Sequence, residues 1–144
     1  AIALGIMLAA FDKALEYAQK RVQFGQPIIN FQLIQEKLAR MAMLIEASRS
    51  MLYRAAYYVD SYIKFQIDPR AMAAITSATK VFVTDAANQV IDEAIQIHGG
   101  YGYFEEFDVE RYWRDHRVTR IYEGTNEINL LTITDALRRG VWKP

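Results

Sequence analysis

The chain has 144 residues, of which 52% are hydrophobic and 24% charged, a composition typical of a single globular domain. Its 17 basic and 17 acidic residues cancel, so no bulk charge favours nucleic acid or an anionic membrane surface. The absence of cysteine excludes disulfides, thiolate metal ligands and a cysteine nucleophile, and no apolar run approaches the roughly 20 residues that span a bilayer.

Two amphipathic helices are predicted in the first 65 residues. The first runs to Phe24, where Gly25 provides a stop and Pro27 keeps the chain extended. Its apolar stripe alternates spacings of four and three: Leu4, Leu8, Phe11, Leu15, Ala18 and Val22. Asn30 can cap the second helix, which is expected from about 31 to 65 and would be near 50 Å long at roughly 1.5 Å per residue. Its stripe contains Phe31, Ile34, Leu38, Met41, Ile45, Ser48, Leu52, Ala55 and Val59.

A third helix is predicted to begin after Asp68, a good N-cap, with Pro69 at the first helical position. It ends at the glycine pair Gly99-Gly100. Its stripe contains Ile75, Thr79, Phe82, Ala86, Val90, Ala94 and Ile97.

The remaining residues predict a short helix around 109–115 and a last helix from about 125 to 138. Thr125 is the expected N-cap of the last helix, and Glu127 lies in its first turn, where an acid favours the helix dipole. No segment alternates with period two for long enough to predict a strand. We therefore expect an all-α fold, an antiparallel four-helix bundle with long helices.

Helix bundles can hold di-iron sites, which require Glu-x-x-His pairs on facing helices. Neither His98 nor His116 has a glutamate three residues before it, so no metal site is expected. Arginines recur every third residue from Arg111 to Arg120, but five acidic residues share the window 105–120. This mixture predicts ion pairs rather than a nucleic-acid track.

Three short stretches each allow more than one interpretation. "QIHGGYGY" fits a helix C-cap, but its exposed N–H groups could also bind a polar ligand beside Gln96. "RVQFGQPI" offers Arg21 as a phosphate clamp and Phe24 as a stacking surface, or simply the end of a helix. "RIYEGTNEINLL" puts Glu123 before the helix cap, where it is either a solvated loop acid or a functional carboxylate.

The order and spacing of these stretches are more informative than any one of them. The series "RVQFGQPIINFQ", "AIQIHGGYGY" and "RYWRDHRVTRIYEGTNEI" resembles the C-terminal helical domain of acyl-CoA dehydrogenases, from Ala1 to about Leu137. The resemblance implies that residues 1–144 are this domain of a longer protein. The N-terminal helical domain and the middle β-domain of the family would then lie outside the chain.

Members of this family use tightly bound FAD to oxidise an acyl-CoA thioester to the trans-2-enoyl-CoA. The family's base lies in the motif Tyr-Glu-Gly, so the resemblance assigns Glu123 to remove the α-proton while the β-carbon delivers hydride to the flavin. Such a base is expected in a dry pocket. The resemblance also implies that the thioester carbonyl accepts hydrogen bonds from the backbone N–H of the base and from a ribityl hydroxyl of the flavin.

The resemblance further assigns the residues around these two ligands. Contacts to the adenine and pyrophosphate end of FAD, typically in the neighbouring subunit, come from Arg21, Gln23, Phe24 and Gln32. The glycine loop contacts the dinucleotide through Gln96, Gly99 and Gly100. Thr125 and Glu127 also touch FAD, and Tyr122 and Gly124 line the thioester site.

Two positions depart from the family pattern, since many relatives continue the motif with Gln-Arg where this chain has Asn129 and Leu130. The expected partners are acyl-CoA, an electron-transferring flavoprotein and further copies of the chain in a dimer or tetramer. The expected compartment is a bacterial or archaeal cytoplasm or the mitochondrial matrix. Two alternatives keep the fold: a non-catalytic helical oligomerisation module, and an acyl-CoA oxidase. The acyl chain length is not specified by this domain.

Overall fold

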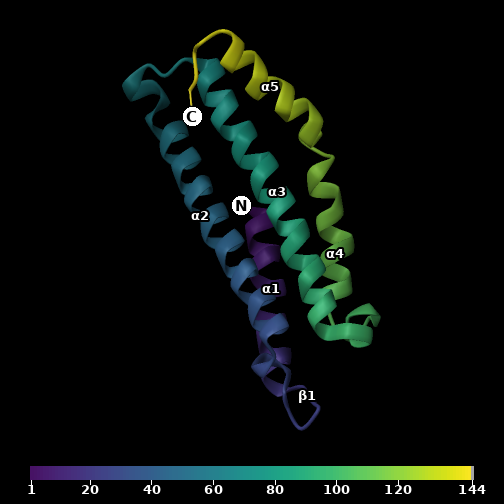
Figure 1. The fold of residues 1–144 in the computed structure, drawn as a ribbon. Helices are drawn as coiled ribbons and strands as arrows, with labels where there is room; N and C mark the ends of the chain where they lie inside the picture. The colour runs from purple at the N-terminus through teal and green to yellow at the C-terminus, as the bar shows by residue number, and fades with distance from the viewer. Residues whose placement is uncertain (144) are drawn as a thin grey trace.

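The protein is all-α apart from one very short hairpin (Figure 1). The computed structural model describes residues 1–143, without the side chains of Ile63 and Phe65. Within the described part the helices are α1 (Ile2–Lys20), α2 (Gln32–Phe65), α3 (Pro69–His98), α4 (Val109–Arg117) and α5 (Asn126–Arg138). Three 3-10 turns, η1 (Ile28–Asn30), η2 (Gly99–Tyr103) and η3 (Val118–Arg120), join them.

The expected four-helix bundle is confirmed, but two shorter helices, α4 and α5, occupy the place of its fourth helix. Helices α2 and α3 run antiparallel, α1 packs against their lower half, and α4 and α5 follow one another along α3 (Figure 1). The chain between α4 and α5 leaves the helical path through η3 and the segment 121–125, so two short helices occupy the place of one long one. This break is where Glu123 lies.

Helix α3 is central, because it contacts α1, α2, α4 and α5. Small side chains let the neighbouring backbones approach it, and Ala74, Ala87 and Ala94 have no exposed surface. Larger side chains fill the spaces between the helices; Met7, Met41 and Ile91 are the largest apolar ones that are fully buried. None of the described helices is both long and apolar enough to cross a membrane.

The end of α1 differs from the prediction. The helix stops at Lys20, and Val22 lies in a hairpin of β1 (Val22–Gln23) and β2 (Gln26–Pro27), with 55% of its surface exposed. Phe24 (φ +52°) and Gly25 (φ +82°) are both left-handed, the pattern of a type I′ hairpin turn. The assignment of Val22 to the helix stripe was wrong because this turn draws the chain into a hairpin whose strands are too short to show a period of two.

The predicted cap of the second helix was also wrong. Asn30 belongs to the 3-10 turn η1, and Phe31 occupies the N-cap of α2 without a capping side-chain bond. The carbonyl oxygen of Phe31 accepts the N–H groups of Ile34 and Gln35, both at 3.0 Å. The helix itself matches its expected range and contains 34 residues, about 51 Å at 1.5 Å per residue.

The caps of α3 and α5 agree with the prediction. The Asp68 carboxylate accepts the N–H of Arg70 at 2.7 Å, with Pro69 in the first turn, and the Thr125 hydroxyl accepts the N–H of Ile128 at 3.3 Å. Helix α3 ends at Gly99, whose φ of +60° suits glycine.

We predict that Asp68→Ala lowers the free energy of unfolding of the chain by roughly 1 kcal/mol, because it leaves an N–H at the start of α3 without its acceptor. Urea unfolding followed by circular dichroism measures the change. Asp68→Asn is the matched control, since asparagine caps helices as well as aspartate does. Equal stability of the alanine variant and the native chain would show that this cap contributes nothing.

Candidate active site

Glu123 lies in a backbone conformation that few residues other than glycine adopt. Its φ is +55°, and that of Gly124 is +80°, so two left-handed residues follow each other directly before α5. A left-handed residue with a side chain costs roughly 1–2 kcal/mol, which the surroundings must offset. The conformation turns the chain sharply at the carboxylate and leaves Glu123 exposed.

Two side chains hold this turn at one atom. The carbonyl oxygen of Gly124 accepts a hydrogen bond from the Lys80 ammonium at 2.9 Å and another from the Asn129 amide at 2.8 Å. The Asn129 amide also donates to the carbonyl oxygen of Thr125 at 3.0 Å. Lys80 approaches from α3 and Asn129 from α5, so the turn is fixed from both sides.

A buried amide connects the start of α5 to α3. Asn126 is 4% exposed, and its amide nitrogen donates to the Thr84 hydroxyl at 3.0 Å and to the Asp85 carboxylate at 2.9 Å. Its amide oxygen accepts from Lys80 at 2.6 Å. Asp85 also forms an ion pair with Arg120 at 2.6 Å, just before the turn. The polar atoms of Asn126 are therefore satisfied although the side chain is out of contact with solvent.

Sequence reasoning missed these supporting residues. Lys80, Thr84 and Asp85 lie on α3 about 40 residues before the motif, and no local pattern links them to it. Burial lowers the pKa of Lys80, and the nearby Asp85 carboxylate opposes that effect. The only sequence feature that could have drawn attention to Lys80 is its position among mostly apolar residues of the helix.

Glu123 and Tyr122 line a cleft of about 480 Å³. Its walls are mostly apolar, with Leu52 and Val59 from α2 among them, and Lys80 is the other charged residue that lines it. The expected dry pocket is not formed by the described residues alone, because Glu123 is exposed. An exposed carboxylate beside an apolar surface can nevertheless meet a substrate that covers both.

A second cleft, of about 530 Å³, lies at the hairpin end of the bundle. Four residues assigned to FAD line it: Arg21, Gln23, Gly99 and Gly100. The Arg21 guanidinium lies 5.3 Å from the centre of the Tyr101 ring. A β-carbon added at either glycine would meet nothing within 4 Å, so the backbone is open toward the cleft. One cation, an aromatic face and a stretch of backbone without side chains suit an anionic ligand that carries a ring.

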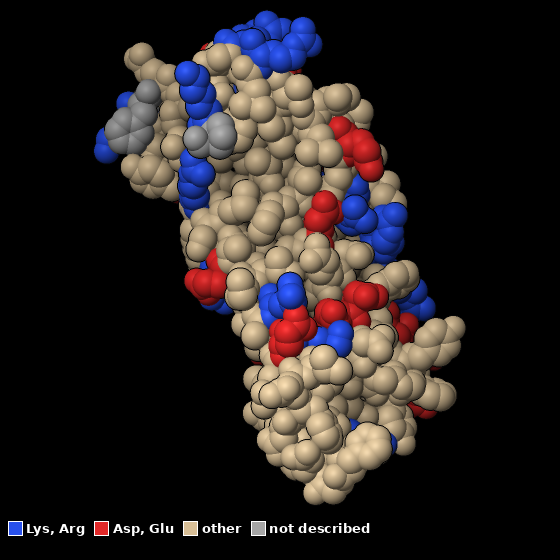
Figure 2. All heavy atoms as spheres, viewed as in Figure 1, with Lys and Arg blue, Asp and Glu red and all other residues tan. Residues whose placement is uncertain are grey.

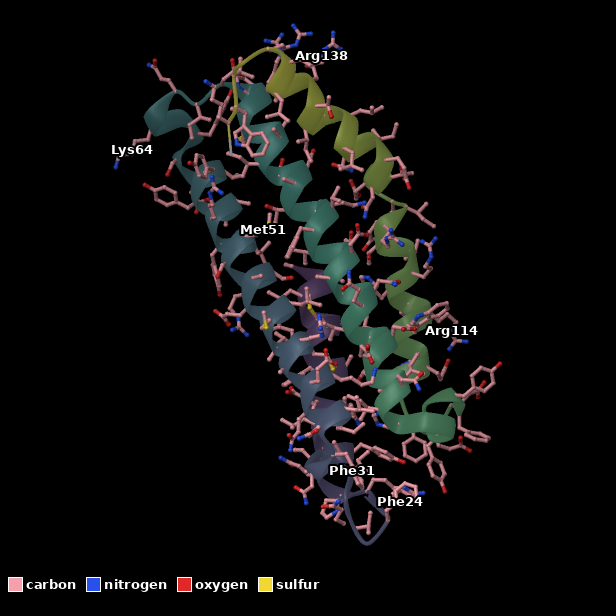
Figure 3. All side chains as sticks on the ribbon, in the orientation of Figure 1. Phe24, Phe31, Met51, Lys64, Arg114 and Arg138 are labelled. Carbon is pink, nitrogen blue, oxygen red and sulfur yellow. The ribbon has the colours of Figure 1, made fainter. Side chains whose placement is uncertain are left out.

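The other predicted cofactor residues flank these two places. Phe24 lies at the tip of the hairpin (Figure 3) and is 92% exposed. Phe24 and Gln32 line the same hollow in the surface. Gln96 is exposed on the last turn of α3 but does not line the second cleft. Thr125 and Glu127 lie at the start of α5, just after Glu123. Hydrogen bonds from the backbone N–H of Glu127 and from the Thr125 hydroxyl lower the pKa of the Glu127 carboxyl.

One chain does not bring the two groups of residues together. Lys80 of α3 is bonded to the turn at Glu123, and His98, which lines the second cleft, lies 18 residues further along the same helix. A helix of that length spans roughly 27 Å. The hairpin end and the junction of α4 and α5 are correspondingly far apart in Figure 1.

Charged side chains of both signs are interspersed across the middle of the face drawn in Figure 2. Two of the three arginines of α4 form ion pairs with acidic neighbours: Arg111 with Asp108 at 3.1 Å, and Arg114 with Glu110 at 3.6 Å. The prediction of ion pairs at these positions is confirmed. Across residues 1–143, no three His, Asp or Glu side chains gather as metal ligands.

Both histidines are structural. Burial lowers the pKa of His98, whose Nδ1–H donates to the Ala94 carbonyl at 2.8 Å, and its ring stacks on Tyr17. Burial also lowers the pKa of His116, whose Nε2–H donates to the Thr84 carbonyl at 2.9 Å. The Thr119 hydroxyl lies 3.2 Å from the other ring nitrogen of His116. These partners fit neutral imidazoles.

Comparisons with known proteins agree with the motif series. The profile of the family described as "Acyl-CoA dehydrogenase, C-terminal domain" matches residues 1–138. A short-chain-specific acyl-CoA dehydrogenase of Megasphaera elsdenii is 48% identical over 137 residues, which are 95% of this chain and 34% of that protein. The chain thus spans about a third of the length of the curated relatives that it matches.

Solved structures give the same likeness. Butyryl-CoA dehydrogenase from Megasphaera elsdenii matches with a TM-score of 0.86 and 46% identity, over 95% of this chain and 34% of its own. An acyl-CoA dehydrogenase complexed with FAD, from Bacillus anthracis, matches with a TM-score of 0.86 and 37% identity, over 95% and 26%. The fold and the sequence therefore indicate the same relatives.

We predict that the chain loses stability as the pH falls below about 6.5, the ordinary pKa of histidine. The folded-state pKa values of both histidines are lowered, so the unfolded chain binds protons first. The stability that the neutral rings provide is complete above 6.5 and is lost as the pH approaches the folded-state values, at up to about 1.4 kcal/mol per histidine per pH unit.

Urea unfolding at steps from pH 7.5 to 5.5 measures this slope, in a range above the ordinary pKa values of the carboxylates. His116→Gln removes one of the two titrations, so its slope should be clearly smaller than that of the native chain. A native stability that stays constant from pH 7.5 to 5.5 would contradict the assignment of neutral buried rings.

Proposed function

Because this chain belongs to the acyl-CoA dehydrogenase family, we propose that it supplies the catalytic base and part of the FAD site for α,β-dehydrogenation of an acyl-CoA thioester. The match to the C-terminal domain of the family, over residues 1–138, supports this role. The remainder of such an enzyme, including an N-terminal helical and a middle β-domain, is proposed to come from a longer protein of which this chain is the C-terminal helical domain.

In the proposed reaction Glu123 removes the α-proton of the thioester. The electron pair of that C–H bond forms the α,β double bond while the β-hydrogen leaves as hydride, which gives the trans-2-enoyl-CoA. Bound FAD supplies the acceptor for this hydride. The backbone N–H of Glu123 is available to donate to the thioester carbonyl, where negative charge develops as the proton leaves.

The observation that carries the proposal is the left-handed turn at Glu123. A solvated loop acid needs no strained backbone. Within the described part of the chain, Glu123 forms no ion pair that would explain this conformation. Here a costly conformation is held by Lys80 and Asn129, and it leaves the carboxylate exposed beside an apolar cleft. Strained conformations that the surroundings enforce cluster at functional sites.

The residues of the hairpin end fit an FAD. Arg21 can pair with a pyrophosphate, and the absence of side chains at Gly99 and Gly100 lets it approach the backbone closely. Phe24, almost fully exposed, offers a face on which an aromatic ring can stack. Gln23, Gln32 and Gln96 add amide groups at the same end.

We infer that FAD lies at a boundary between subunits. The hairpin residues and the Glu123 turn are separated by roughly 27 Å along α3 in one chain, so a second copy has to bring its own hairpin to the base. A dimer or tetramer meets this requirement. An electron-transferring flavoprotein is the proposed acceptor of the electrons.

Two alternatives keep the fold and change the function. An acyl-CoA oxidase would produce hydrogen peroxide during turnover, and a non-catalytic oligomerisation module would assemble without reducing flavin. The clamped turn at Glu123 disfavours the second, because assembly requires no carboxylate in that conformation.

We predict that Glu123→Gln, in the full-length protein that contains this chain, binds FAD normally but reduces it with acyl-CoA at least 1,000-fold more slowly, since the amide cannot accept the α-proton. Stopped-flow absorbance of the flavin band measures the rate. Glu106→Gln, a change of another exposed loop acid, is the control and should leave the rate unchanged. Normal flavin reduction by Glu123→Gln would remove Glu123 from this role.

We also predict that Arg21→Gln weakens FAD binding by about tenfold or more, because a charged hydrogen bond to the pyrophosphate is lost. Fluorescence titration of the apoprotein with FAD measures the affinity. Arg138→Gln is the matched control, since Arg138 lies at the opposite end of the molecule (Figure 3). An unchanged affinity in Arg21→Gln would exclude Arg21 from the FAD site.

A further inference from the structure

The carbonyl group of Gly124 is held by an ammonium group that lies outside the three motifs quoted above. Lys80 donates to this oxygen at 2.9 Å, across 44 residues of sequence, and the same ammonium donates to the Asn126 amide oxygen at 2.6 Å. One side chain of α3 thus joins the carbonyl before α5 to a buried side chain in the first turn of α5.

The bond from Lys80 is not needed to start the helix. The Thr125 hydroxyl already caps α5 by accepting the N–H of Ile128, and Asn126 is tied to α3 independently through Thr84 and Asp85. What Lys80 adds is a restraint on the residue next to Glu123. The peptide plane that carries the Gly124 oxygen is held by the bonds from Lys80 and Asn129 together, and loss of either bond leaves it freer to rotate.

That restraint acts on the conformation that presents the carboxylate. Glu123 and Gly124 are both left-handed, and a residue with a side chain relaxes from that region when nothing holds it. Lys80 and Glu123 line the same cleft but form no ion pair among those of the described residues. Lys80 therefore acts on the backbone of the turn rather than on the carboxylate itself.

We propose that Lys80 is a positioning residue for proton abstraction, which holds the Gly124 carbonyl and thereby keeps Glu123 aimed at the α-carbon. The proposal rests on the proposed function of Glu123. Small displacements of a catalytic group of the order of 1 Å slow reactions by about 100-fold, so loss of this bond should reach the chemical step.

The test is Lys80→Met in the full-length flavoprotein with FAD bound. We expect the rate of flavin reduction at saturating acyl-CoA to fall about 10- to 100-fold, while FAD content, acyl-CoA affinity and the rate of chemical reduction by dithionite stay within twofold of native values. Lys80→Arg keeps a charged donor at this position and should recover a substantial part of the rate. A general loss of folding would not produce this separation.

Lys13→Met is the matched control, because it removes a lysine that makes one surface ion pair, with Asp108 at 3.1 Å, away from the turn. It should reduce flavin at the native rate. If Lys80→Met does not yield folded holoenzyme, Asn129→Ala tests the same restraint, since it removes the second donor to Gly124. Its rate should then fall in the same selective way.

Three results would overturn the inference. Lys80→Met could reduce flavin at the native rate, or its slower reduction could be accompanied by equal losses of FAD or acyl-CoA affinity. Lys80→Arg could also reduce flavin no faster than Lys80→Met. In the Asn129→Ala experiment, flavin reduction at the native rate would also overturn the inference. Glu123→Gln is measured alongside: if it reduces flavin normally, the proposed function itself fails, whereas an inactive Glu123→Gln with a native Lys80→Met rejects the role of Lys80 alone.

Discussion

The packing of α3 against all four other helices is the constraint on which both candidate sites depend. Its alanines let α1, α2, α4 and α5 approach closely, and the polar residues Lys80, Thr84 and Asp85 appear where α5 begins. Its far end opens into the glycine loop beside the hairpin. A helix of 30 residues thereby fixes the distance between the strained turn at Glu123 and the cleft at the hairpin end.

This arrangement is the reason for proposing that FAD lies at a boundary between subunits. The residues assigned to the far end of FAD and the residue assigned as base belong to the same chain, yet α3 holds them roughly 27 Å apart. Glu123 is also exposed, although a base that removes a weakly acidic proton requires water to be excluded. In the proposed enzyme, surfaces from another subunit or another domain would meet both requirements.

The sequence predicted some features that depend on neighbouring residues, was wrong on others, and missed those that depend on distant residues. Asp68 and Thr125 cap helices by bonds to residues two and three positions away, so both could be recognised. Val22 was wrongly assigned to the first helix, because the left-handed turn at Phe24 places it in a hairpin although it continues the apolar spacing of the helix. Lys80 could not be identified because its bond to Gly124 crosses 44 residues. Glu123 was found only through its motif, and its role remains a prediction.

Asn129 shows how a departure from the family pattern fits the same logic. Many relatives carry Gln-Arg where this chain has Asn129 and Leu130. The short amide of Asn129 reaches back over one turn to the carbonyls of Gly124 and Thr125, at 2.8 and 3.0 Å. A glutamine has one more methylene group, so its amide would have to fold back to make the same bonds. Asn129 thus provides a second restraint on the turn, and half-exposed Leu130 presents an apolar side chain beside it.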